Sequence, residues 1–266
     1  MRRLPLSLFF TCLFTLDASA HEFWISPNSY MVSPDQQVEA NIRVGQNFKG
    51  GAYSFVPAQF VRFDLVQSDT VIPVQGTVGD RPALTMPAPD EGLVIAVHQT
   101  TDSFVTYRDA ALFENFVRHK DFAWALDQHV ERGLPETGFH ERYSRYAKSL
   151  IAIGAGGGAD RPVGMETEIV ALANPYTDDM ATGLPVQVFY QGDVRADVQV
   201  ELFERDPAGE VLVTLHRTDE KGVAVIPVKP GHEYLVDAVV MRALDVTEDN
   251  KAPWESLWAS LTFKLP

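Results

Sequence analysis

Hydrophobic and polar residues alternate in short runs along most of the chain, and turn residues separate these runs. A period of two is typical of β-strands with one buried face. The run ADVQVELFE shows it clearly, because Val198, Val200 and Leu202 fall on one face. The pattern predicts strands over residues 38–44, 60–66, 70–74, 92–98, 168–173, 185–190, 197–203, 211–216, 223–228, 234–240 and 256–264.

A helical period replaces the alternation between residues 109 and 133. Apolar residues recur there near the spacing that places them on one helix face, and Gly133-Leu134-Pro135 ends the pattern. A second helical piece is predicted over residues 141–151. The apolar positions of the first segment are Ala110, Phe113, Phe116, Val117, Ala123, Leu126 and Val130.

A glycine-rich stretch, IGAGGGADRPVG at residues 153–164, predicts the main boundary of the chain. Glycines remove side-chain packing and add backbone freedom, as in linkers and long loops. The prediction is a mainly β protein with two domains. Residues 21–153 would form a β-rich domain with an inserted helical segment, and residues 165–266 an Ig-like antiparallel β-sandwich.

The first twenty residues have the pattern of a signal peptide. Two arginines precede a largely apolar run over residues 4–16, and Ala18-Ser19-Ala20 supplies the small residues that signal peptidase requires. The run is shorter than the ~20 residues that span a bilayer, and no later segment is apolar enough to do so. The prediction is secretion with cleavage after Ala20. The single cysteine, Cys12, lies in this leader, so the mature chain would contain neither a disulfide nor a thiolate.

The chain is acidic, with a formal net charge of −14. Loss of residues 1–20 removes two arginines and one aspartate and brings the charge to −15. Such a charge excludes nucleic acid and anionic lipid as partners. The sequence also contains no nucleophile elbow, phosphate-binding loop or dinucleotide-binding glycine pattern. The interpretation is a protein that is not an enzyme.

Several stretches resemble one known family when they are taken together and in order. They are HEFWISP, RVGQNF, ERYSRYAKSLI, ALANPY, LPVQVFYQG, TDEKGVAVIPV, PGHEYLVDAV and WESLWASLTF. The set is similar to a periplasmic domain-of-unknown-function family that is labelled as the periplasmic component of ABC-type cobalt/nickel transport. The resemblance implies a β-rich periplasmic protein near transition-metal uptake, whose partner is a membrane transporter or an outer-membrane receptor. Val240 stands where the family often carries a histidine.

His21 is the strongest candidate for chemistry, because cleavage after Ala20 would make it the first residue. Its free α-amine and the Nδ1 atom of its ring could then close a six-membered chelate on Cu(II) or Ni(II). An internal histidine cannot do this, because its backbone nitrogen is an amide. The alternative is that His21 is only the residue that processing leaves at the end.

His98, at the end of the predicted strand LVIAVHQ, is the best candidate for a further metal ligand. The alternative is a half-buried strand histidine that bonds a neighbour. His140, next to Glu141, is a weaker candidate. The predicted site is therefore one divalent transition-metal ion, Ni, Co or Cu, on His21 and His98. Phe23 and Trp24 would anchor this end of the chain by burial.

Three classes of function remain open from the sequence. The first is a non-catalytic, metal-binding accessory protein of a transition-metal uptake system. The second is an interaction or scaffold module at the cell envelope that binds no metal. The third is a copper enzyme with a histidine brace, which would need a flat exposed substrate face.

Overall fold

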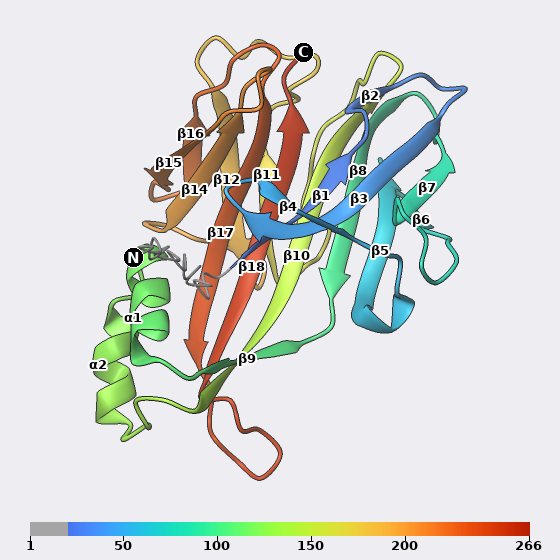
Figure 1. Ribbon diagram of the computed structural model, residues 1–266. Helices are drawn as coiled ribbons and strands as arrows, with labels where there is room; N and C mark the ends of the chain where they lie inside the picture. The colour runs from blue at the N-terminus through green and yellow to red at the C-terminus, as the bar shows by residue number, and fades with distance from the viewer. Residues whose placement is uncertain (1–20) are drawn as a thin grey trace, which may run out of the picture.

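The computed structural model describes residues 21–266, which form three β-sheets and two α-helices (Figure 1). The predicted signal peptide and its cleavage after Ala20 lie outside the described residues. The prediction of a mainly β protein built on β-sandwich packing is confirmed. Eleven predicted strands are all present, with bounds that differ by a few residues at most.

One large sheet of ten strands runs through the whole molecule. Its strands follow one another in the order β15-β14-β17-β18-β10-β8-β5-β6, and β2 and β9 also pair with β10. Their bounds are β15 Val211–Arg217, β14 Gln199–Arg205, β17 Glu233–Ala243, β18 Trp254–Lys264, β10 Phe139–Ile153, β8 Gly92–Thr100, β5 Phe60–Gln67, β6 Thr70–Pro73, β2 Met31–Val32 and β9 Ser103–Tyr107.

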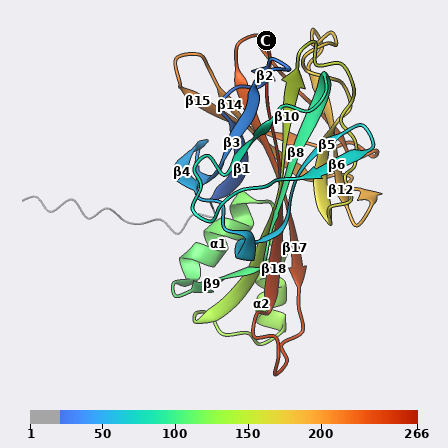
Figure 2. The same cartoon turned by 90° about the vertical axis from the view of Figure 1, so that its right-hand side faces the viewer.

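Two smaller sheets cover opposite faces of the large sheet (Figure 2). Each small sheet therefore encloses a separate hydrophobic core with the large sheet. Side chains of β10 alternate between the two cores: Ala147 and Ile151 belong to one, and Tyr146 and Leu150 to the other. The first small sheet consists of β1 Glu22–Pro27, β3 Gln37–Gln46, β4 Lys49–Tyr53 and β7 Leu84–Pro87. The second consists of β11 Thr167–Ala171, β12 Leu184–Tyr190, β13 Asp193–Val194 and β16 Val223–Ile226.

The predicted helical insertion is confirmed as α1, Ala110–His119, and α2, Trp124–Glu131. The carboxylate of Asp109 caps α1 by accepting a hydrogen bond of 3.0 Å from the backbone N–H of Ala111. Apolar side chains of the helices pack on Trp254 and Trp258 at one end of β17 and β18 (Figure 1). Within residues 21–266, no helix is long and apolar enough to cross a membrane.

The prediction of a second helix over residues 141–151 is wrong, because this segment is part of the fifteen-residue strand β10. The strand lies between two covered faces, so most of its side chains are buried and the two-residue alternation is lost. It pairs in parallel with β18 from Glu141 to Ser149.

The glycine-rich segment connects β10 to β11, and strands from both sides of it join the same large sheet. The segment is also tied down by buried carboxylates. Asp160 lies 2.7 Å from the ammonium of Lys148, and both side chains are completely buried. The carboxylate of Glu168 accepts hydrogen bonds from the backbone N–H groups of Val163 and Gly164. Independent folding of residues 165–266 stays a prediction. The alternative is that both parts of the chain fold together, because they share the large sheet.

Candidate functional site

His21 is exposed and lies directly before β1, and all residues of this strand are buried. Phe23 and Ile25 point into the core between β1 and the large sheet. Trp24 points to the other side and packs edge-on against Phe48, with ring centroids 5.5 Å apart. Burial of Phe23 and Trp24 is therefore confirmed.

His98 is almost completely buried, with 1% of its surface exposed. It lies opposite Phe63 across β5 and β8, and its ring centroid lies 4.9 Å from that of Phe63. The rings of Phe60 and Phe23 lie 4.5 and 5.2 Å away. Neither Nδ1 nor Nε2 has a hydrogen-bond partner. Burial lowers the pKa of His98 to about 3, so its imidazole is neutral.

The Phe23 ring, two residues after His21, contacts His98, and no described contact joins His21 itself to His98. In the described part of the chain, no three histidine, cysteine, aspartate or glutamate side chains are grouped to hold a metal ion. The remaining histidines have other partners. These contacts are His119 with Glu201, His129 with Pro135, His140 with Thr106, His216 with Thr214 and His232 with Glu204.

A buried charged cluster beneath the start of β1 was not predicted from the sequence. Glu201 and Asp237 lie directly opposite each other on β14 and β17. The Lys120 ammonium, at the end of α1, lies 2.9 Å from Asp237 and also bonds Glu201. His119 lies at the rim, with Nε2 3.1 Å from a Glu201 oxygen. The only sequence signal was that Glu201 and Asp237 each lie within an apolar run, VELF and LVDAV. A single polar residue in such a run resembles the ordinary alternation of a strand.

Glu22 is the fourth member of this cluster and the residue next to His21. This residue is 4% exposed, and one of its carboxyl oxygens, Oε2, has no partner. The pKa of Glu22 is raised to about 7, mainly because the residue is buried. The negative charge of Asp237 contributes to this rise, and its effect is larger than the opposite effect of the positive charge of Lys120. Burial disfavours the charge of Lys120, but Asp237 and Glu201 outweigh this effect and raise its pKa. The arrangement keeps an ammonium between two carboxylates beside a carboxyl that is half protonated near pH 7.

We expect this carboxyl to make the protein less stable as the pH rises from about 4.5 to about 7. In that window unfolded Glu22 has lost its proton and folded Glu22 retains it, so unfolding releases a proton and the free energy of unfolding falls with pH. The loss is on the order of 3 kcal/mol. Glu22→Gln should remove this slope and be the more stable protein at pH 8. Urea unfolding from pH 4.5 to 8 measures it, and equal slopes in both proteins would contradict it.

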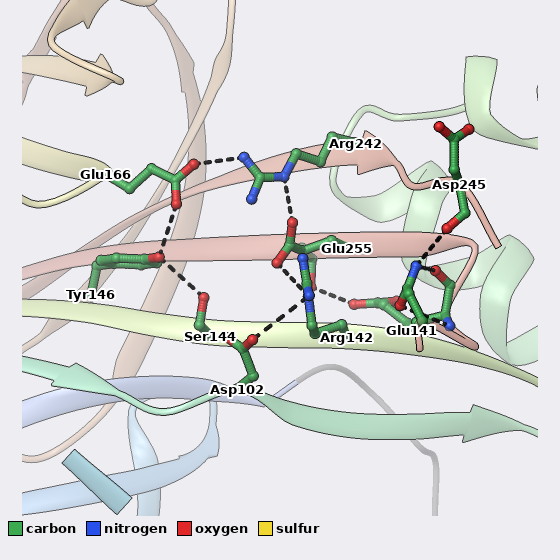
Figure 3. A network of polar contacts seen from close by, with 12 residues as sticks. Asp102, Glu141, Arg142, Ser144, Tyr146, Glu166, Arg242, Asp245 and Glu255 are labelled. Carbon is green, nitrogen blue, oxygen red and sulfur yellow. Dashed lines mark hydrogen bonds and ion pairs between the residues drawn. The ribbon is translucent and has the colours of Figure 1, made fainter. Parts of the chain in front are cut away.

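A second polar network spans β10, β17 and β18 (Figure 3). Glu255 accepts hydrogen bonds from both Arg142 and Arg242, and Arg242 also lies 2.6 Å from a Glu166 oxygen. Arg142 thus forms ion pairs with Glu255 and Asp102. Arg145 has a different environment. It is buried, and its guanidinium stacks 4.2 Å from the Trp258 ring centroid.

Comparison with known proteins assigns the chain to a family. Residues 18–242 match the family described as Domain of unknown function (DUF4198). No curated protein matches the chain. Two solved structures are similar over most of it. One is a tetra-tandem repeat in the extending region of a large adhesion protein, at 13% identity and a TM-score of 0.23, covering 93% of this chain and 50% of that one. The chain thus spans about half the length of that structure. The other is the D0-D1 domain of intimin, at 14% identity and a TM-score of 0.24, covering 91% and 97%.

Proposed function

This chain belongs to the DUF4198 family, and we propose that it is a periplasmic protein that binds one transition-metal ion, Ni, Co or Cu, for a metal uptake system. It would do so without catalysing a reaction. Its partner would be a membrane transporter or an outer-membrane receptor. The leader pattern supports export, and the acidic mature chain suits a cation as ligand.

The unpartnered imidazole of His98 is the observation that supports metal binding. A buried polar group without a hydrogen bond costs about 1–3 kcal/mol, so each such group calls for an explanation. A metal ion at one ring nitrogen would offset this cost. The pKa of about 3 keeps His98 in the neutral form that metals bind.

His21 would supply two more nitrogens, the α-amine and Nδ1, in a chelate of the kind that Cu(II) and Ni(II) favour. Burial of Phe23 and Trp24 holds this pair at the start of β1, so little freedom remains to be lost on binding. Phe23 contacts the His98 ring, so an ion that reaches His98 from the His21 side has to displace the Phe23 ring.

One residue added before His21 should lower the affinity for Cu(II) about 100-fold or more, because the amine becomes an amide. Loss of a supporting residue outside the ligand set already lowers metal affinity by about 10- to 100-fold. The measurement is calorimetric titration of tag-free protein that begins at His21 against the extended form. Affinity should also fall as the pH drops, because both nitrogens must lose their protons to bind.

Two variants separate the roles of the ligands. His98→Phe replaces an unpartnered imidazole by an apolar ring, so it should fold at least as well and bind metal more weakly. His216→Phe is the matched control, because it changes a histidine on a different strand, β15. Equal affinity in the extended form and in the processed protein would reject the site.

The second candidate is an interaction module that binds no metal. The enclosure of His98 by three phenylalanine rings favours it, as does the lack of a three-residue metal cluster among residues 21–266. It takes first place if the processed protein binds neither Cu(II) nor Ni(II). Nothing in the geometry favours the copper-enzyme alternative.

A further inference from the structure

The large sheet ends in two very different edges. At one end β6 has only four residues and finishes at Pro73, which cannot donate a backbone hydrogen bond. At the other end β15 has seven residues and, among residues 21–266, pairs only with β14. A long unpaired edge presents a row of backbone donors and acceptors to another strand.

The composition of β15 does not protect this edge. Its sequence, VLVTLHR, contains no proline or lysine, which commonly blunt an edge strand, and its one arginine, Arg217, stands at its end. Leu212 and Leu215 are 56% and 58% exposed. They point to opposite faces of the sheet, because they are three residues apart. Each face of the strand therefore carries one exposed leucine, while Val211 and Val213 pack on the cluster of Trp24 and Phe48. The strand is unpaired along its outer side.

We propose that β15 pairs with β15 of a second copy of this chain, antiparallel, about a two-fold axis that passes through Val213. This joins two large sheets into one. In a two-fold antiparallel pair, the side chains that lie opposite each other must come from the same face of the sheet. The axis must therefore pass through a residue and not between two residues. With the axis at Val213, the facing pairs are Glu210–His216, Val211–Leu215, Leu212–Thr214 and Val213–Val213.

This register is self-complementary, which is the argument for a second copy as the occupant. An acidic side chain faces an imidazole, and the apolar side chains face one another or a threonine. Arg217 would face Gly209, which leaves room for the long side chain. An axis one residue later, at Thr214, would instead set Arg217 against Val211 and His216 against Leu212. Unlike neighbours of that kind add nothing to the pairing.

The contact is small, since seven residues of strand extend over roughly 23 Å. It lies toward the low end of stable interfaces, so the dimer should depend on concentration. Sedimentation equilibrium of protein beginning at His21, from micromolar to sub-millimolar concentration, should show a monomer–dimer equilibrium. Leu212→Lys with Leu215→Lys should abolish the dimer, because it replaces exposed apolar side chains of the contact by charged ones. The variant should still fold, because both side chains can be changed without opening the core. Val78→Lys, at a site 71% exposed outside the strands, should leave it unchanged.

Cysteine cross-linking tests the register. The chain from His21 onward contains no cysteine, so an introduced one can pair only with its copy. Val213→Cys should form a disulfide-linked dimer under mild oxidation, because the axis places residue 213 opposite itself. Leu212→Cys should link poorly, because its copy is displaced along the strand. A monomer at every concentration, a dimer that survives the two lysines, or equal linking at 212 and 213 would each overturn the proposal. None of these results bears on metal binding.

Discussion

Lys120→Met is expected to lower the free energy of unfolding by about 3–5 kcal/mol at neutral pH. The ammonium is 4% exposed and lies between the buried carboxylates of Glu201 and Asp237, which face each other on neighbouring strands. Methionine fills a similar volume and carries no charge. Its introduction therefore leaves two like charges buried together, beside the Glu22 carboxyl.

The pH dependence distinguishes this mechanism from a packing defect. Without the ammonium, the pKa values of Glu201 and Asp237 rise in the folded variant, so its unfolding releases protons near neutral pH. The loss of stability in Lys120→Met should therefore shrink as the pH falls from 7 to 5. Urea unfolding of both proteins across this range measures it. Arg118→Met, which breaks the exposed pair with Glu114, is the control and should cost less than about 1 kcal/mol. A loss that does not change with pH would contradict the charge argument.

Lys148→Met is expected to destabilise the protein by a similar amount, about 3–5 kcal/mol, and to loosen the glycine-rich segment after β10. Lys148 and Asp160 are both completely buried, and Asp160 also accepts a hydrogen bond of 2.8 Å from the backbone N–H of Ala171. Removal of the ammonium leaves the Asp160 charge without its cation. The carboxylate can then regain solvation only by pulling residues 154–164 away from the sheet.

Limited proteolysis with mass spectrometry reports this local effect, and urea unfolding reports the global one. The wild-type protein should resist cleavage within residues 154–164, and Lys148→Met should be cut there. Lys229→Met, which removes an exposed partner of Glu204, should behave like the wild type. If the wild-type segment is cut readily and residues 165–266 stay folded alone, the segment is a mobile joint between two domains. Fragments that remain associated after cleavage would instead indicate one shared core.

Local pattern was enough to predict most elements but not how strands meet. The alternation predicted strands such as β3 and β12 because a half-buried strand exposes every second side chain, and the period of α1 and α2 arose in the same way. It failed for β10, since this strand is covered on both faces and its buried side chains mask the alternation. The parallel pairing of β10 with β18 was hidden for a related reason. The two strands are far apart in the sequence, so only the closed sheet brings them together.

The sequence by itself determined the leader pattern, the place of His21 directly after it, and the closeness of Phe23 and Trp24 to His21. Each of these features depends on neighbouring residues alone. Only the tertiary structure decided that His98 lies among three phenylalanine rings without a hydrogen bond. It also decided that Glu22, Lys120, Glu201 and Asp237 share one buried cluster, although they come from four separate elements. The environment of a charge depends on which faces pack together, and that is set by contacts between residues far apart in the sequence. Lys120, for example, lies 81 positions from Glu201 and 117 from Asp237.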